Sequence, residues 1–448
     1  MLSALRVVFR LVLRIFFRRI EVTGRDRVPP SGPVIFVLNH PNGLIDPAFL
    51  VCFAPRRVSF LAKAPLFRMP VVGWFCRRFQ AIPVYRHQDV GVDASQNRET
   101  FEAARRVLGG GGAIAIFPEG TSHSDPRMRP LKTGAARIAL GAAAALGGEQ
   151  SIAIVPAGIY YRAKQIFRSV ALLYFAEPFP VTPLAEPLAP GAEPPAGPVR
   201  ELTTQIQRAL AEVTLQAGRL EALALVAKAE RILRARDEPP DVVPTLAEEL
   251  ELRRRLVLGH DVLRERWPDR FAAIEARIVR YEATLEAAGV EPHHLTPRGY
   301  TITRVTRYAV QAAIVFLILL PLALAGAIVH YPAYRAVGHI ATGIAKGEEE
   351  TLASVKLLAA MLLFPVTWTL AAAAAWVWLG PKAGLAVLVM LPLAGMGSLW
   401  FFERLDRLVG RARALRLLLF RRRAFLRLTA ERRAIRDQIV ELGATLEG

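Results

Sequence analysis

Cysteine is nearly absent from this sequence: Cys52 and Cys76 are the only two among 448 residues. Two cysteines at this spacing provide neither a disulfide framework nor a metal site, and we interpret both as small buried apolar side chains. No set of histidine, cysteine and acidic residues has metal-ligand spacing, so the sequence predicts no metal and no bound cofactor. No Gly-x-Ser-x-Gly motif surrounds Ser122 or Ser124, which argues against a serine nucleophile.

Acidic residues are scarce relative to basic ones: 39 Asp and Glu stand against 58 Lys and Arg, a formal net charge of +19. Such a charge suits either nucleic acid or an anionic lipid surface. Hydrophobic residues make up 53% of the chain, which is too apolar for an ordinary soluble enzyme. The basic blocks at 1–19 and 404–436 adjoin apolar stretches. We therefore predict anionic membrane lipids, and not nucleic acid, as partners.

The first 19 residues contain arginines at every fourth position from Arg6 to Arg18, with Leu, Val, Ile and Phe between them. A helix with this pattern has one basic stripe and a broad apolar face. The arginines interrupt the apolar run and no small-residue cleavage site follows, so the pattern is not that of a signal peptide. It predicts a basic amphipathic helix at the membrane interface over residues 1–19.

Short aliphatic runs predict buried strands, and longer amphipathic or alanine-rich runs between them predict helices. The predicted strands lie at 33–38, 113–117 and 152–156, and the predicted helices at about 47–54, 93–108 and 133–146. Their alternation predicts an α/β domain, a mixed sheet flanked by helices, over residues 20–175. Eight prolines between Pro178 and Pro198 then predict a linker over 176–199.

The remainder of the chain is predicted to be helical. It divides by composition into a helical region at 200–300, a membrane region with two or three transmembrane helices at 301–403, and an Arg-rich helical tail at 404–448. The membrane region contains apolar runs at about 309–330, 353–379 and 383–402. Basic residues flank both of its ends, so the positive-inside rule requires an even number of crossings. One run, the first or the third, is therefore expected to be re-entrant or buried.

The stretch NHPNGLIDP, residues 39–47, follows a predicted strand, and its Pro41 and Gly43 favour a turn. Histidine is the natural general base near neutral pH, and a carboxylate that accepts its other ring N–H fixes the tautomer. Residues six apart point to different faces of a helix. A turn can instead bring Asp46 back to His40, and we predict a general-base pair of these two side chains.

Three further blocks lie in the same predicted domain: IPVYR at 82–86, FPEGTSHSD at 117–125 and IVPAGIYY at 154–161. In the FPEGTSHSD block a strand leads into a turn, so Glu119 and the backbone N–H groups of Gly120 and Thr121 are predicted to contact an acceptor substrate. Basic side chains hold phosphate through charge-assisted hydrogen bonds. The candidates for this role are Arg86, Arg129 and Lys132.

In this order and spacing, NHPNGLIDP, IPVYR, FPEGTSH and IVPAGIY resemble the four blocks of the glycerolipid acyltransferases, the glycerol-3-phosphate and lysophosphatidate acyltransferases. The resemblance covers about residues 20–175. It implies acyl transfer from a thioester of coenzyme A or acyl carrier protein to a glycerol hydroxyl, without an acyl-enzyme intermediate. It also implies roles for five residues: general base for His40, orientation of that base for Asp46, and acceptor binding for Glu119, Gly120 and Arg86.

Two departures from the commonest pattern narrow the resemblance. Five residues, not four, separate His40 from Asp46, and Ser122 and His123 stand where the third block usually has an arginine. Both departures resemble a fungal-type glycerol-3-phosphate or dihydroxyacetone-phosphate acyltransferase subgroup with a long helical and membrane extension. The acceptor expected from this likeness is an unacylated glycerol phosphate.

The expected location is a bacterial-type inner membrane or its equivalent, with the active site facing the cytoplasm where thioester donors are found. Two alternatives stay open. One is a remodelling transferase that acylates a lysophospholipid. The other is a non-catalytic membrane-binding protein on the same fold, against which the intact His40, Asp46 and Glu119 argue.

Overall fold

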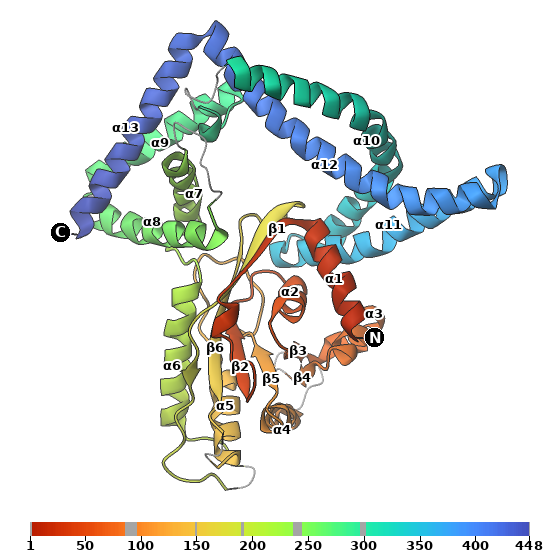
Figure 1. Ribbon diagram of the computed structural model, residues 1–448. Helices are drawn as coiled ribbons and strands as arrows, with labels where there is room; N and C mark the ends of the chain where they lie inside the picture. The colour runs from red at the N-terminus through yellow and green to blue at the C-terminus, as the bar shows by residue number, and fades with distance from the viewer. Residues whose placement is uncertain are drawn as a thin grey trace. The chain divides into compact units, whose positions relative to one another are not determined.

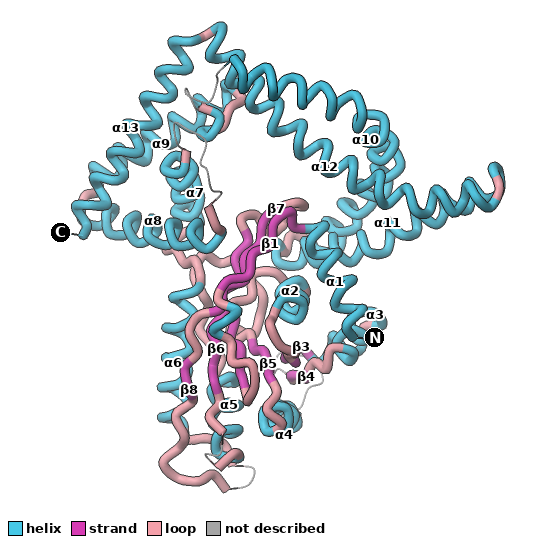
Figure 2. The backbone as a smooth tube through the Cα atoms, in the orientation of Figure 1, coloured by secondary structure: helices cyan, strands magenta, loops and turns pink. Residues whose placement is uncertain are grey.

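The computed structural model describes residues 2–85, 96–147, 150–189, 192–235, 244–295 and 302–447. The chain divides into two compact units. The first comprises Met1–Gln216 together with Ile344–Leu357, and the second comprises Ala217–Gly343 and Leu358–Gly448. Each unit is described separately (Figures 1 and 2).

The first unit is built on a mixed sheet, which has eight strands in the part of the chain that the structure describes. The strands are β1 (Phe17–Thr23), β2 (Val34–Leu38), β3 (Ser59–Lys63), β4 (Ile82–Val84), β5 (Ala113–Ile116), β6 (Ala153–Tyr161), β7 (Ser169–Phe175) and β8 (Phe179–Pro180). Their order is β1-β7-β6-β2-β5-β3-β4, with β8 paired to β6. The run from β6 to β4 is parallel, and β7 and β8 are antiparallel to β6.

Helices cover both faces of this sheet, as the sequence predicts. They are α1 (Leu2–Phe16), α2 (Ile45–Phe53), α3 (Pro70–Arg78), α4 (Gln96–Gly109), α5 (Gly134–Ala145) and α6 (Ala196–Val213), with 3-10 turns at Arg25–Arg27 and Ala64–Arg68. Alternate residues of β2 point to opposite faces. Ile35 and Val37 join a core cluster with side chains of α4, α5 and α6, while the Phe36 ring packs against Phe175. The α/β prediction is therefore confirmed.

The parallel strands β2, β5 and β6 end at one edge of the sheet, and the loops that follow β2 and β5 carry predicted site residues. In β2, Val37 pairs with Pro156 of β6 and with Ile116 of β5. The loops that follow β2 and β5 consequently leave the sheet side by side. Strand β6 continues past the end of β2 to Tyr161, so its last residues flank the loop that follows β2.

The predicted interfacial helix is shorter than residues 1–19, because strand β1 begins at Phe17. Two of its arginines bind protein rather than face solvent. Arg6 donates to the carbonyl oxygens of Cys52 (3.2 Å) and Ala54 (2.6 Å), and Arg10 donates to that of Cys52 (2.6 Å). These carbonyls lie at the end of α2, where a helix accepts cations favourably. The exposed apolar face of α1 comprises Val7, Val8 and Leu11.

The first unit is also larger than the predicted domain of residues 20–175. Helix α6 begins within the proposed 176–199 linker and packs its Val199, Leu202, Ile206 and Leu210 into the sheet core. Residues 344–357, far along the chain, belong to the same unit. Composition marks the proline-rich segment, but it does not show that the helix after that segment returns to the sheet.

The second unit contains a helical core. Its helices are α7 (Leu220–Arg234), α8 (Leu246–Arg266), α9 (Pro268–Ala288) and α13 (Arg422–Glu447), with a 3-10 turn at Pro292–His294. Side chains from α7, α9, α12 and α13 form one buried cluster. Arg432, only 1% exposed, donates to the carbonyl oxygens of Pro292 (2.9 Å) and Leu295 (2.8 Å) and so ties α13 to the turn.

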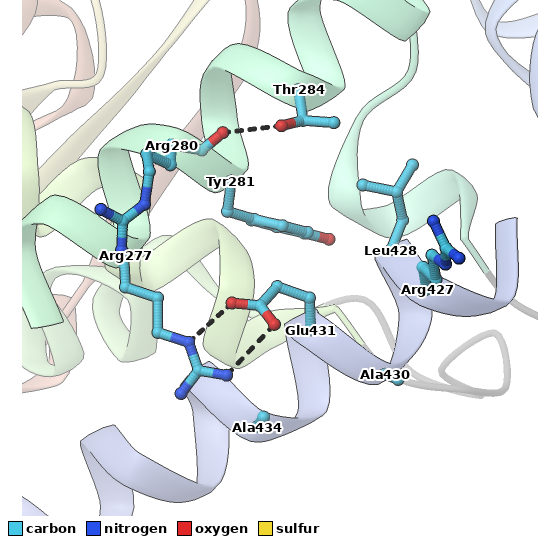
Figure 3. A pocket seen from close by; sticks show the side chains of 9 residues that line it. All are labelled: Arg277, Arg280, Tyr281, Thr284, Arg427, Leu428, Ala430, Glu431 and Ala434. Carbon is cyan, nitrogen blue, oxygen red and sulfur yellow. Dashed lines mark hydrogen bonds and ion pairs between the residues drawn. The ribbon is translucent and has the colours of Figure 1, made fainter. Parts of the chain in front are cut away.

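A cavity of about 570 Å³ opens between α9 and α13 (Figure 3). Arg277 spans it and binds Glu431 through two nitrogen–oxygen contacts of 2.6 and 3.1 Å. This guanidinium lowers the pKa of the Glu431 carboxyl. None of the predicted site residues lines this cavity, and its arginine–glutamate pair joins two helices.

In the part of the chain that the structure describes, three helices are long and apolar enough to cross a membrane: α10 (Ile302–Ala345), α11 (Glu349–Leu379) and α12 (Pro381–Phe420). Prolines lie inside each of them, at Pro321 and Pro332 of α10, Pro365 of α11 and Pro392 of α12. Helix α12 runs through the expected boundary at residue 403 without a break. The last apolar run and the start of the arginine-rich tail thus form one continuous helix, which ends at Phe420.

Candidate active site

The loop after β2 folds as a turn that leads into α2, and this explains the spacing of six between His40 and Asp46. Strand β2 ends at Leu38, and α2 begins at Ile45. The carbonyl oxygen of Asn42 accepts the N–H groups of Ile45 (3.0 Å) and Asp46 (3.2 Å), which closes the turn. Asp46 therefore lies in the first turn of α2, directed back toward the end of the strand.

The structure brings the predicted pair together. His40 Nδ1 lies 2.8 Å from Asp46 Oδ2, which also accepts the backbone N–H of Asn42 at 2.7 Å. Asp46 is completely buried, whereas the His40 side chain keeps 14% of its surface exposed. Because Asp46 accepts the Nδ1–H, the assigned tautomer leaves Nε2 of His40 as the basic nitrogen.

A tyrosine completes this pair. Tyr161, the last residue of β6, donates its hydroxyl to Asp46 Oδ1 at 2.7 Å. Burial, followed by the charge of Asp46, raises the pKa of Tyr161 well above its ordinary value, so the phenol remains a donor. Its ring stacks on Phe17 with centroids 5.3 Å apart. Tyr161 is the last residue of the block IVPAGIYY, and the sequence predicts no role for it because nothing local links it to Asp46.

The histidine is held on two further sides. Asn39 extends the strand ladder, donating to Ile159 O (3.0 Å) and accepting from Ile159 N–H (2.8 Å). The ring of Phe117 stacks against the His40 ring with centroids 4.2 Å apart. The loop after β2 is therefore joined to β6 through a side-chain amide and to the loop after β5 through aromatic packing.

The loop after β5 buries the predicted acceptor-binding glutamate. Glu119 is 4% exposed, and its Oε2 accepts from His123 Nε2 and from the backbone N–H of Arg129 at 2.8 Å. His123 Nδ1 accepts the N–H of Asp125 at 3.2 Å, so Nε2 carries the hydrogen that Glu119 accepts. The N–H of His123 donates to His40 O at 3.2 Å. His123 thus links Glu119 to the general-base pair, a connection that the sequence alone did not indicate.

The other residues predicted around Glu119 lie in the same loop. Gly120, with φ of +74°, donates its N–H to Phe117 O (3.0 Å) and closes a turn. Lys132 lies beside it, since a Cβ on Gly120 would lie 3.4 Å from Lys132 Cγ. The Thr121 hydroxyl donates to Ser122 O at 3.3 Å.

The two predicted phosphate ligands of this region differ in exposure and pairing. The Lys132 side chain is exposed. Arg129 is paired with Asp125 (2.6 Å), which lowers the pKa of that carboxyl. The third predicted phosphate ligand, Arg86, lies outside the described residues.

A lysine that sequence reasoning missed lies between the two loops. Lys164 Nζ donates to Pro41 O at 2.8 Å and to Ser124 Oγ at 2.6 Å. Burial lowers the pKa of Lys164, against the opposing effect of Glu350. Its contact with Pro41 O holds the ammonium group against the turn that follows His40. Among the described residues, no group of three or more His, Cys, Asp and Glu side chains could hold a metal ion.

The structure thus places the hydrogen-bonded pair of His40 and Asp46 at one sheet edge, beside a second loop with the buried Glu119. Residues 19–160 match the family model named Acyltransferase. Residues 237–447 match the Glycerol-3-phosphate acyltransferase 2 C-terminal domain. Two family models thus match successive parts of the chain, the acyltransferase model in the first part and the glycerol-3-phosphate acyltransferase 2 C-terminal model in the second.

Similar proteins agree with this assignment. An uncharacterized acyltransferase of Schizosaccharomyces pombe is 24% identical over 456 residues, covering 81% of this chain and 66% of that protein. Glycerol-3-phosphate O-acyltransferase 2 of Saccharomyces cerevisiae is 28% identical over 285 residues, covering 61% and 37%. A 1-acyl-sn-glycerol-3-phosphate acyltransferase of Chlamydomonas reinhardtii is 28% identical over 124 residues, covering 28% and 35%. The chain thus spans between about one third and two thirds of the length of these relatives.

Proposed function

We propose that this protein is a membrane-bound O-acyltransferase that transfers a fatty acyl group from a thioester donor to a hydroxyl of glycerol 3-phosphate. The observation that carries the proposal is the buried Asp46, which accepts hydrogen bonds from His40 and Tyr161 and directs Nε2 of His40 outward. A neutral imidazole oriented in this way is suited to remove a proton from a hydroxyl group.

The chemistry follows from that orientation. The oxygen of the acceptor hydroxyl attacks the thioester carbonyl carbon and forms a C–O bond. His40 Nε2 takes the hydroxyl proton in the same step. The charge that develops on the imidazole is stabilised by Asp46. The tetrahedral intermediate then breaks its C–S bond, and the protonated His40 returns the proton to the departing thiolate. Atoms and charge balance without an acyl-enzyme intermediate.

The acceptor assignment rests on the loop after β5 and on the relatives. Glu119 lies in the loop whose His123 N–H bonds His40 O, and its carboxylate would accept a hydrogen bond from a hydroxyl of the acceptor. Lys132, and Arg86 as a further candidate, would bind the phosphate. The yeast relatives are named as glycerol-3-phosphate O-acyltransferases, which favours glycerol 3-phosphate over a lysophospholipid.

The donor would be a coenzyme A or acyl carrier protein thioester. The three long apolar helices associate the protein with a membrane. We propose an inner membrane or its equivalent, with the site facing the cytoplasm and anionic lipids as partners of the basic helices. The exposed apolar face of α1 suits contact with that surface.

The test is acyl transfer from labelled palmitoyl-CoA or palmitoyl acyl carrier protein in membranes that contain wild-type protein or His40→Ala. The acceptors are glycerol 3-phosphate, 1-acylglycerol 3-phosphate and a lysophosphatidylcholine. We expect labelled 1-acylglycerol 3-phosphate from the first acceptor, with loss of at least about 1,000-fold in His40→Ala.

Each outcome of this test is decisive. A preference for 1-acylglycerol 3-phosphate or for the lysophospholipid would overturn the acceptor assignment while leaving acyl transfer in place. Transfer by His40→Ala at the wild-type rate would overturn the mechanism. Absence of transfer to every acceptor from both donors would support the non-catalytic alternative.

A further inference from the structure

The first turns of α11 belong to the first unit, which contains the mixed sheet. Residues 344–357 are part of the first unit, and α11 begins at Glu349. Three side chains of this segment bind loops of the catalytic edge. Ser354 Oγ accepts the N–H of Leu44 at 2.9 Å, Glu350 Oε2 accepts the hydroxyl of Ser124 at 3.4 Å, and Lys356 Nζ donates to Gln165 O at 3.0 Å.

The contact with Leu44 matters because of where Leu44 lies. It is the residue before α2, and Asp46 is in the first turn of that helix. The first N–H groups of a helix have no partner within the helix, and α2 has no side-chain cap of its own. The hydroxyl of Ser354, 310 positions along the chain, supplies the acceptor for the Leu44 N–H. Ser354 is itself 4% exposed, so water does not readily replace it.

Gly43 shows that this approach is close. Its φ is +27°, and a Cβ there would lie 2.9 Å from both Glu350 O and Ser354 Oγ. Such a distance requires a shift, and the first of these atoms is backbone. The turn between His40 and Asp46 is therefore shaped to receive the start of α11.

From these contacts we propose that Ser354 is a positioning residue for the general-base pair. It fixes the turn in which Asp46 holds His40, so that a residue of the C-terminal domain match completes a site formed by the acyltransferase match. The inference rests on the proposed function for its catalytic readout. The positioning itself is a property of the turn and is measured separately.

The first test compares Ser354→Ala with Ser354→Thr and with the control Ser398→Ala, in full-length protein reconstituted in lipid. Ser398 is also a buried serine of an apolar helix, but it bonds Ala323 O and Ala394 O. Loss of the acceptor for a part-buried N–H predicts a fall in kcat of roughly 5- to 50-fold for Ser354→Ala. We expect KM for both substrates to stay within about twofold, because the residue contacts neither substrate. Ser354→Thr restores the hydroxyl and should recover at least half of kcat.

The second test needs no activity. Hydrogen–deuterium exchange of peptides that cover residues 39–50 should be at least about tenfold faster in Ser354→Ala than in wild type, and unchanged in Ser398→Ala. Equal exchange and equal kcat in wild type and Ser354→Ala overturn the proposal. A change in KM alone also overturns the proposal, since it indicates an effect on substrate binding. An equal fall of kcat in Ser398→Ala overturns it too, since it indicates a general effect on the apolar helices. If wild type transfers no acyl group but the exchange difference is present, the proposed function fails while the positioning role stands.

Discussion

Replacement of Tyr161 by phenylalanine removes one hydroxyl from the proposed catalytic network and little else. The ring keeps its stacking on Phe17 at 5.3 Å and its edge contact with Phe49 at 6.2 Å, so the core is preserved. What is lost is the 2.7 Å hydrogen bond to Asp46 Oδ1. Since Asp46 is fully buried, no water replaces the lost hydroxyl, and Oδ1 of Asp46 is left without this hydrogen-bond donor.

The size of the effect follows from that geometry. Hydrogen bonds to charged groups contribute about 1.5–3 kcal/mol, and more is lost when the partner is left buried without a donor. If Asp46 then holds and stabilises protonated His40 less well in the transition state, the loss appears in kcat. The expected decrease is about 10- to 150-fold. KM for the acceptor should change by less than about threefold, because Tyr161 is bonded to Asp46 and not to the substrate-binding loop.

The assay is steady-state acyl transfer with purified wild type, Tyr161→Phe and the control Tyr174→Phe. Tyr174 is a tyrosine of β7 whose hydroxyl accepts from Arg27 at 3.1 Å. The control should retain kcat within about twofold. A Tyr161→Phe enzyme with wild-type kcat would refute the reasoning, because it would show that Asp46 works equally well without its buried donor.

Further substitutions test other parts of the structure. Glu119→Gln should raise KM for glycerol 3-phosphate about tenfold in the transfer assay, because the neutral amide oxygen accepts weaker hydrogen bonds from His123 and the Arg129 backbone than the carboxylate does; an unchanged KM would contradict this. Gly43→Ala should lower the free energy of unfolding by about 1–3 kcal/mol and lower activity with it, as measured by urea denaturation. Burial raises the pKa of the Cys52 thiol to about 12, so iodoacetamide at pH 8 should label it only after denaturation, as read from the intact mass.

The blocks in the sequence predict the edge of the sheet well, because their information is local. A strand, a turn and a helix start within NHPNGLIDP, and the turn returns Asp46 to His40. The buried Glu119 and the turn at Gly120 are likewise encoded within nine residues. Such local patterns determine which loops carry polar side chains and where strands end.

The residues that support the pair of His40 and Asp46 cannot be predicted from such local patterns. Tyr161 is 115 positions from Asp46, and Ser354 is 310 positions from Leu44, so no periodicity or motif links them. Lys164 follows a strand as an ordinary polar residue, and only the fold brings it to Pro41 O. Sequence reasoning also ended the domain at residue 175, because α6 and the start of α11 join it across a proline-rich segment and across the second unit.

The number of membrane crossings follows from contacts within each unit and from chain connections. Leu295, before α10, and Ala414, in α12, are in the same buried cluster, so the chain enters and leaves the apolar region on one side. We therefore predict an even number of crossings between them, so that the three apolar helices do not each cross once. Helices α11 and α12 meet at Gly380 with no room for a further element, and we predict that they form a hairpin of two crossings.

We predict that helix α10 is then the one that does not cross. Its end is followed by residues 344–357, which belong to the first unit and bind the catalytic turn. Single cysteines at Lys346 and Lys382 test this with a membrane-impermeant maleimide applied to sealed vesicles of each orientation. Lys346→Cys should be labelled from the side of the acyltransferase domain, and Lys382→Cys from the opposite side. Labelling of both from one side would mean that α11 does not cross and that the parity argument fails.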